Sequence, residues 1–299
     1  MALPPVFTHD ACLAHNPGPG HPESPRRLEV LLERLGREPG AEVRQAGPAD
    51  VESIVRVHPG HYLDFLTATS ARGGGMLDAD TILNERSWEA ALGAAGAALD
   101  ATRYAVNGGG HAFAAVRPPG HHALRERAMG FCLLGNVVVA AREARTLGKE
   151  RVLIVDWDVH HGNGTQALVE LDPAIRFVSM HEWPAYPGTG LARERGVGNI
   201  FNVPMPAGLP RSEYVEALLT AVARATEEWT PDIVLISAGY DSLAGDPLGG
   251  FTLEPVDYTT LVRAFRDRFP SVPIVGLLEG GYAPGRVADG VVATLLGLA

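Results

Sequence analysis

The sequence predicts an α/β protein in which a mostly parallel β-sheet carries helices on both faces. Three observations lead to this fold class. Short apolar runs rich in Val and Ile alternate with longer amphipathic stretches, as expected of parallel strands joined by crossover helices. Residues 152–155 are apolar without alternation, which is typical of a strand buried on both faces. The composition, with 46% hydrophobic and 20% charged residues, fits a globular protein with a large core.

The apolar runs place the expected strands at residues 6–9, 111–116, 152–155, 175–180, 232–237 and 273–278. No Pro- or Ser-rich linker, block of like charges or change of composition interrupts residues 1–299. We therefore expect one domain that spans residues 1–299.

Residues 24–36 carry the signals of a complete helix. Ser24 is expected to cap it, Pro25 to occupy its first position and Gly36 to end it. Its apolar stripe consists of Leu28, Leu31, Leu32 and Leu35. We expect this stripe to pack on the core.

Helical periodicity places five further helices at residues 61–71, 86–106, 133–148, 211–228 and 255–269. Ser87 is the expected cap of the Ala-rich helix, and Gly93 and Gly96 are expected to permit close packing of that helix. Gly148 is the expected stop of the helix before it.

The composition also excludes several classes of protein. A formal charge of −10 argues against a nucleic-acid surface. No apolar stretch approaches the roughly 20 residues that span a bilayer, and residues 1–10 lack the pattern of a signal peptide. Cys12 and Cys132 are far apart, so neither a disulfide framework nor a thiolate zinc site is expected. We expect a cytoplasmic protein, and the oligomeric state stays open.

Acidic and imidazole side chains alternate directly after the apolar run at residues 152–155. Asp156, Asp158 and His160 follow one another at every second position, so in extended backbone they point to the same side. They would converge at the carboxyl end of a strand, where open α/β sheets place their chemistry. An ordinary acidic loop is the alternative, but unpaired buried charge is costly, which favours a metal site.

A third ligand has to come from another strand end. Asp241 is the best candidate, because it lies in a Gly-rich loop after the apolar run at residues 232–237. Asp246 in the same loop competes with it. Three protein ligands with an open position are typical of catalytic Zn²⁺, and two carboxylates in the set make Fe²⁺ a competitor.

Two adjacent histidines follow the expected strand at residues 111–116. The prolines in Arg117-Pro-Pro-Gly-His-His122 restrict the backbone just before His121 and His122. This loop therefore presents both imidazoles in a defined geometry. Other strand ends carry polar residues beside glycines as well, among them His181 and the Glu279-Gly-Gly-Tyr282 turn.

Taken together, these motifs resemble the metal-dependent histone deacetylases and their bacterial relatives, which include acetoin-utilisation proteins and acetylpolyamine amidohydrolases. The blocks occur in the family's order and span most of the chain. They are Arg117-Pro-Pro-Gly-His-His-Ala123, Gly130-Phe-Cys132, Asp156-Trp-Asp-Val-His-His-Gly-Asn-Gly-Thr-Gln166, Tyr186-Pro-Gly-Thr-Gly190, Ser237-Ala-Gly-Tyr-Asp-Ser-Leu-Ala-Gly-Asp-Pro247 and Leu278-Glu-Gly-Gly-Tyr282. Asn163 and the segment His21-Pro-Glu-Ser-Pro-Arg-Arg-Leu28 are similar to the class II branch.

The resemblance implies an arginase/deacetylase fold and hydrolysis of an acyl amide by metal-activated water. It implies Asp158, His160 and Asp241 as ligands of Zn²⁺, with Fe²⁺ possible. His122 would be the general base and then the general acid.

The resemblance implies supporting roles for four other residues. His121, hydrogen-bonded to Asp156, would supply positive charge or orientation, and Asn163 would hold His122. A neutral Asn raises the pKa of His122 less than an Asp would. Tyr282 would donate to the oxyanion; a packed tyrosine is the alternative, but the glycines of its turn would then be superfluous.

The substrate site is likewise implied by resemblance. Phe131 and Tyr186 resemble the channel walls, Gly130 the acceptor of the scissile N–H, and Leu248 a rim residue. The family also binds structural K⁺, and one such site is matched by Asp156, Asp158, His160 and Ser179.

The resemblance leaves three readings of the function open. The first is deacylation of acyl-lysine in a protein or peptide. The second is an acetylpolyamine amidohydrolase, although Leu248 stands where the polyamine branch often has an acidic residue. The third is a non-catalytic binder of acyl-lysine, which would need neither the paired histidines nor Tyr282.

Overall fold

A computed structural model of the chain, which describes residues 2–299, contains one sheet of eight parallel strands in the order β2-β1-β5-β10-β9-β6-β7-β8. These strands are β1 (Val6–Thr8), β2 (Val43–Gln45), β5 (Ala112–Ala114), β6 (Val152–Asp156), β7 (Ile175–Glu182), β8 (Ile200–Met205), β9 (Ile233–Ala238) and β10 (Ile274–Leu278). A separate antiparallel pair is formed by β3 (Gly74–Met76) and β4 (Ile82–Asn84).

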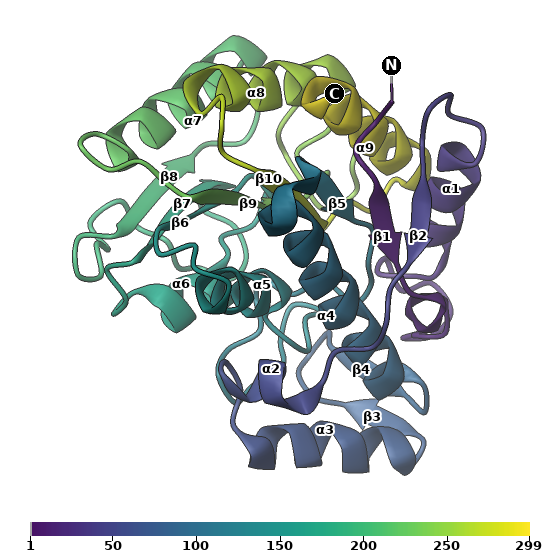
Figure 1. The fold of residues 1–299 in the computed structure, drawn as a ribbon. Coiled ribbons are helices and arrows are strands. Elements are labelled where there is room, and N and C mark those ends of the chain that lie inside the picture. Colours follow the sequence, from purple (N-terminus) through teal and green to yellow (C-terminus); the bar gives the residue numbers. More distant parts are fainter. Residues whose placement is uncertain (1) are drawn as a thin grey trace.

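Helices cover both faces of this sheet, as Figure 1 shows. One face carries α1 (Arg26–Leu35), α7 (Arg211–Ala225), α8 (Pro255–Arg268) and α9 (Pro284–Leu298). The other carries α4 (Ser87–Tyr104), α5 (Asn136–Thr146) and α6 (Asn163–Val169). The helices α2 (Val51–Val55) and α3 (Gly60–Ala71) lie with the β3–β4 pair at the far end of α4 (Figure 1). The α/β class predicted from the sequence is therefore confirmed.

The central strands are buried along their whole length. Every residue of β5, β6, β9 and β10 is inaccessible to solvent, which explains their continuous apolar sequence. All six strands expected from the sequence are present, within about two residues at each end. No helix within residues 2–299 combines the length and apolar character that crossing a bilayer requires.

Two of the expected helix caps are wrong. Pro25, rather than Ser24, precedes the first residue of α1, and no side chain caps that helix. Ser87 is the first residue of α4 rather than its cap. Its hydroxyl donates to Oδ1 of Asn84 (2.7 Å) and lies 2.8 Å from Nδ1 of His15, so tertiary hydrogen bonds replace the capping one.

The close packing expected at two glycines of α4 is confirmed. A Cβ atom on Gly96 would lie 2.0 Å from the carbonyl oxygen of Gly47, and one on Gly93 would lie 2.8 Å from the ring of His9. The N-terminal segments therefore contact α4 directly.

Several elements were not expected from the sequence, and their composition explains why. The edge strand β8 contains Pro204, which a sheet tolerates at its edge but which weakens the strand pattern. The helix α9 begins with Pro284 but contains three glycines, which lower helix propensity. Packing against α1 and α8 supplies the stability that local propensity lacks.

Candidate active site

The carboxyl ends of four neighbouring strands carry most of the polar residues singled out in the sequence. β5, β10, β9 and β6 are adjacent and parallel, so the loops that follow them meet at one edge of the sheet. The loop after β6 contains Asp158 and His160, and the loop after β9 contains Asp241. The turn after β10 contains Tyr282.

Asp158, His160 and Asp241 form a compact group whose ligand-type atoms all lie within 4.8 Å of one another. Nδ1 of His160 lies 3.1 Å from Oδ1 of Asp158 and 3.2 Å from Oδ2 of Asp241. Both carboxylates also accept hydrogen bonds from the backbone. The N–H of Gly280 donates to Oδ2 of Asp158 and the N–H of Val159 donates to Oδ1 of Asp241, each at 2.8 Å. We refer to these three side chains as the acid–imidazole triad.

The triad fits a divalent cation for two reasons. Oδ2 of Asp241 is buried and has no hydrogen-bond partner within residues 2–299. Burial, together with the negative charge of Asp158, raises the pKa of Asp241 to about 7. A bound cation would satisfy the orphaned oxygen and relieve the repulsion between the two carboxylates. One imidazole and two carboxylates are a ligand set that suits Zn²⁺ or Fe²⁺.

The paired histidines lie next to the triad with their rings 4.0 Å apart. Nδ1 of His121 lies 3.0 Å from Oδ2 of Asp156, and Nδ1 of His122 lies 2.7 Å from Oδ1 of Asn163. Both partners are acceptors, so we assign the ring proton to Nδ1 in each case. Nε2 of His122 therefore keeps its lone pair.

The two imidazoles differ in their tendency to carry charge. Burial opposes a charge on His121, but the carboxylates of Asp158 and Asp156 outweigh it and raise the pKa of His121 well above its usual value. Burial and the positive charges of His121 and His160 instead lower the pKa of His122 well below its usual value. An imidazole whose surroundings favour the charged form thus lies beside one whose surroundings favour the neutral form, which is suited to accept a proton.

A cavity of about 330 Å³ leads to these groups. It is lined by Asp80, His122, Gly130, Phe131, His160, Ala185, Tyr186, Leu248 and Tyr282. The four residues that resemblance assigned to substrate binding therefore all line one cavity. A larger groove of about 870 Å³ lies between α7 and α8, but Arg211 and Asp257 pair with each other there and no catalytic group faces it.

Aromatic rings form much of the wall of the cavity. The ring of Tyr186 is perpendicular to that of His122 at 5.1 Å, and the ring of Phe131 meets that of Tyr282 edge-on at 5.8 Å. Gly130 has a positive φ of 54°, and a Cβ atom there would lie 2.4 Å from the ring of His122. Only glycine can bring the backbone this close to His122.

The turn that carries Tyr282 is fixed by buried charges. The guanidinium of Arg27 lies 5.0 Å from the centre of the Tyr282 ring, and its Nε donates to the carbonyl of Gly281 (2.5 Å). Burial raises the pKa of Tyr282 well above its usual value, so the phenol keeps its proton and can donate it in a hydrogen bond.

Asp246, the alternative third ligand, has a different position. Its carboxylate accepts hydrogen bonds from the N–H groups of Tyr282 (2.6 Å) and Leu248 (2.9 Å). Asp241, and not Asp246, completes the acid–imidazole triad. Asp246 instead joins the rim of the cavity to the Tyr282 turn.

Comparison with known proteins identifies the family. Residues 21–298 match the family model of the histone deacetylase domain. The chain belongs to the histone deacetylase family. A histone deacetylase-like amidohydrolase of Pseudomonas aeruginosa is 36% identical over 311 residues, which cover 94% of this chain and 82% of that protein. This membership makes the protein a hydrolase and confirms the family inferred from its motifs.

Two solved structures of the histone deacetylase fold are similar over nearly the whole chain. The HDA15 HD domain superimposes with a TM-score of 0.94 at 34% identity, covering 99% of this chain and 88% of that one. The acetylpolyamine aminohydrolase from Burkholderia pseudomallei has a TM-score of 0.91 at 27% identity, covering 99% and 98%. The arginase/deacetylase architecture expected from the sequence is therefore present.

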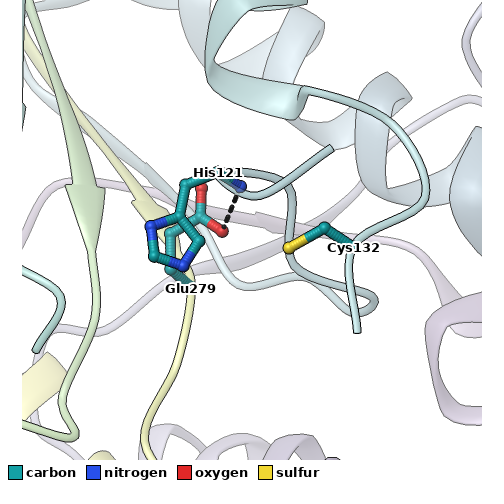
Figure 2. Close-up of side chains that lie close together, drawn as sticks. All are labelled: His121, Cys132 and Glu279. Atoms are coloured by element: carbon teal, nitrogen blue, oxygen red, sulfur yellow. Dashed lines mark hydrogen bonds between the residues drawn. The ribbon is translucent and has the colours of Figure 1, made fainter. Parts of the chain in front are cut away.

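A second group of ligand-type residues in this histone deacetylase fold consists of His121, Cys132 and Glu279, shown in Figure 2. Oε2 of Glu279 accepts from the N–H groups of Gly120 (2.6 Å) and His121 (3.1 Å), and the second bond is the dashed line in Figure 2. The thiol of Cys132 lies 3.3 Å from the carbonyl oxygen of Gly130 and accepts from the N–H of His122.

This second group does not suit a metal ion, because the Glu279 carboxylate and the Cys132 thiol are already hydrogen-bonded to backbone groups. Burial, reinforced by the charge of Glu279, raises the pKa of the Cys132 thiol well above its usual value, so Cys132 stays protonated. Nδ1 of His121 is bonded to Asp156. The group instead supports the loop that presents His121 and His122.

The residues matched to a K⁺ site lie close together. Asp156 and Ser179 are register partners on β6 and β7, and Oδ1 of Asp156 accepts from the N–H of Asp158 (3.1 Å). The hydroxyl of Ser179 lies 3.0 Å from Nδ1 of His181.

Two residues at the site had no role assigned from the sequence. Asp80 lines the cavity, but the loop that contains it has no periodic or motif signal. Glu279 was noted only as a polar residue after a buried strand. Its position directly before the Gly-Gly-Tyr282 turn, with an apolar run ahead of it, was the available signal.

Proposed function

We propose that the protein hydrolyses the amide of an acylated primary amine, and that its substrate is an acyl-lysine side chain in a protein or peptide. The observation that carries this proposal is that His122 and His160 of the acid–imidazole triad line the same aromatic-lined cavity, with their ring centres 6.0 Å apart. A long aliphatic arm fits between the rings of Phe131 and Tyr186 and would bring its amide to these groups.

The cofactor we propose is Zn²⁺, with Fe²⁺ as the alternative, held by Asp158, His160 and Asp241. When bound, such an ion supplies Lewis acidity to the amide carbonyl and to a water molecule.

His122 moves the proton in this proposal. Its Nε2 is free to accept a proton from water, because Nδ1 is bonded to Asn163. The lowered pKa of His122 keeps Nε2 unprotonated before the reaction. The same nitrogen then delivers the proton to the departing amine.

His121 and Tyr282 stabilise negative charge. His121 keeps a positive charge through its bond to Asp156 and places that charge 4.0 Å, ring to ring, from His122. The Tyr282 phenol remains protonated and lines the same cavity as His122, where it can donate to the developing oxyanion. Gly130 would accept from the N–H of the scissile amide.

A monovalent cation is a further part of the proposal. K⁺ would bind at Asp156, Asp158, His160 and Ser179, of which Asp156 and Ser179 are register partners on adjacent strands. Its role would be structural. We propose a cytoplasmic location for the protein.

An acetylpolyamine is the second candidate substrate. The similarity to the Burkholderia acetylpolyamine aminohydrolase and the carboxylate of Asp80 at the cavity favour a cationic amine. The neutral, 42% exposed side chain of Leu248 at the same cavity favours acyl-lysine, because it offers no second negative charge. A non-catalytic binder has no use for the His121–His122 pair.

A substrate screen tests the proposal. The purified protein, supplied with Zn²⁺, would be offered an acetyl-lysine peptide, peptides with longer acyl chains and acetylspermidine, with and without a chelator. We expect release of the acyl group from the peptides that the chelator abolishes. Faster hydrolysis of acetylspermidine would favour the second candidate, and peptide binding without release would contradict the enzymatic proposal.

A further inference from the structure

A buried hydroxyl, that of Thr81, connects two residues that line the cavity, Phe131 and Asp80. Thr81 is only 1% exposed and lies just before β4, on the turn that links β3 to β4. Its Oγ1 donates to Oδ1 of Asp80 (3.0 Å) and accepts from the backbone N–H of Phe131 (3.0 Å). A threonine hydroxyl can donate one hydrogen bond, and here the Asp80 carboxylate accepts it.

The Phe131 end of this link is a strained position. Phe131 has a φ of 67°, a left-handed conformation that residues other than glycine rarely adopt. Such a conformation persists only where its surroundings hold it. The hydroxyl of Thr81 holds the N–H of Phe131, and the ring of Phe131 then packs edge-on against His21 (4.8 Å) and Tyr282 (5.8 Å).

The Asp80 end of the link is held from two sides. The bond from Thr81 takes Oδ1, which leaves Oδ2 as an acceptor for an N–H group of a substrate. Nδ1 of His21 accepts from the N–H of Glu23, so Nε2 carries the proton and donates to the backbone carbonyl of Asp80 (3.0 Å). The hydroxyl of Thr81 thus orients the carboxylate while His21 fixes the backbone.

We propose that Thr81 is a positioning residue that sets the spacing between the aromatic wall at Phe131 and the acceptor at Asp80. This inference rests on the proposed deacylase function. Thr81 contacts neither the triad nor the paired histidines, so its role is in the affinity for substrates that extend beyond the cavity. A peptide has backbone N–H groups that can donate to Asp80, whereas a small acetamide such as N-butylacetamide has no N–H group besides that of its scissile amide.

The test compares two variants of nearly equal size. Thr81→Val keeps the shape of the side chain and removes both hydrogen bonds, whereas Thr81→Ser keeps the hydroxyl. With an acetyl-lysine peptide, we expect Thr81→Val to raise KM about tenfold and to leave kcat within about twofold, since one bond to a charged group is lost. Thr81→Ser should restore the KM of the wild type. With N-butylacetamide, Thr81→Val should change kcat/KM less than about threefold.

Two results would overturn the inference. One is a peptide KM in Thr81→Val equal to that of the wild type. The other is an equal loss of kcat/KM on the peptide and on N-butylacetamide, which is what a purely structural role predicts. If Thr81→Val does not fold, Asp80→Asn replaces it, because that variant keeps Thr81 and removes only the charged acceptor. An unchanged peptide KM in Asp80→Asn would also contradict the inference.

A binding measurement separates this inference from the proposed function. The affinity of a fluorescein-labelled acetyl-lysine peptide can be measured by anisotropy, whether or not the peptide is hydrolysed. If the wild type binds the peptide and releases no acetate, the proposed hydrolysis is wrong and the affinities still test Thr81. If the wild type hydrolyses the peptide and Thr81→Val binds it equally well, only the inference about Thr81 fails.

Discussion

Two neighbouring groups at the carboxyl edge of the sheet contain ligand-type side chains, yet only one is suited to bind a metal. In the acid–imidazole triad, Oδ2 of Asp241 has no hydrogen-bond partner in the described part of the chain, and two carboxylates lie close to each other. In the group around Glu279, the carboxylate and the Cys132 thiol are used in bonds to backbone N–H and carbonyl groups. The presence of His, Cys, Asp and Glu side chains alone therefore does not define a metal site. What distinguishes the two groups is whether their acceptor atoms are already satisfied.

The two groups also depend on each other. Glu279 holds the backbone of the loop that places His121 and His122 beside the triad. Residues that support ligands and catalytic groups are as necessary to a site as the groups themselves. Substitutions in the two groups should therefore separate metal binding, chemistry and loop support.

The largest difference is expected for metal content. Asp241→Ala removes a ligand of the triad, so we expect no bound Zn²⁺ and no turnover above background. Cys132→Ala removes the sulfur of the second group and should retain Zn²⁺ at the wild-type level. Elemental analysis of both purified variants measures this difference directly. Full Zn²⁺ occupancy in Asp241→Ala would mean that the ligand set is wrong.

Tyr282→Phe sharpens the comparison by separating metal binding from chemistry. The phenol lines the cavity but is not one of the proposed metal ligands, so the Zn²⁺ content should not change. We expect kcat to fall by roughly 10² or more, because one donor to the oxyanion is lost. Steady-state kinetics on an acetyl-lysine peptide would measure this fall in kcat, and a kcat equal to that of the wild type would mean that Tyr282 has no part in the mechanism.

The sequence predicted the fold from local patterns, and it predicted which side chains come together at the site from those patterns and from the family resemblance. The strand at 152–155 can be recognised because all its residues are apolar, and the residues after it because Asp156, Asp158 and His160 stand at every second position. Asp241 could be placed at the same edge because parallel strands end together. The cap at Ser87 was wrong because a distant partner, His15, bonds the same hydroxyl group, and the cap at Ser24 was wrong because the helix starts one residue later, with Pro25 in the capping position.

The supporting residues could not be predicted for the same reason. Asp80 and Thr81 acquire their roles only when the turn before β4 meets the loop that contains Phe131, about 50 residues away. Glu279 acts on Gly120, from which it is separated by 159 positions in the chain. Contacts of this range leave no periodic signal in a single sequence.

A smaller effect is expected at Glu279, the centre of the second group. Glu279→Ala leaves the N–H groups of Gly120 and His121 without their acceptor, and each buried unsatisfied group costs about 1–3 kcal/mol. We expect a lower free energy of unfolding and a kcat about tenfold lower, with unchanged Zn²⁺ content. Glu279→Gln keeps one acceptor oxygen and is the matched control. Equal kcat in wild type and Glu279→Ala would contradict the role of Glu279 in loop support.

The smallest effect on activity is expected at His58, a histidine that is satisfied in the same way as the second group. Its Nε2 accepts from the N–H of Gly135 (2.9 Å), and its Nδ1 lies 3.0 Å from the carbonyl oxygen of Arg125. Burial lowers the pKa of His58 to about 4. Protonation of Nε2 would break the bond to Gly135.

This lowered pKa predicts how stability depends on pH. As the pH falls below about 6.5, the unfolded chain binds a proton at His58, whereas the folded chain binds it only near pH 4. The free energy of unfolding therefore falls as the pH decreases between these two values. Above about pH 6.5 the contribution is constant. His58→Gln offers an amide donor and acceptor in place of the ring and does not titrate. Urea unfolding at pH 7 and pH 4.5 should show that the wild type loses about 2–3 kcal/mol more than His58→Gln. Equal losses in the two proteins would mean that His58 is not held neutral by its two backbone bonds, and the analogy with the second group would fail.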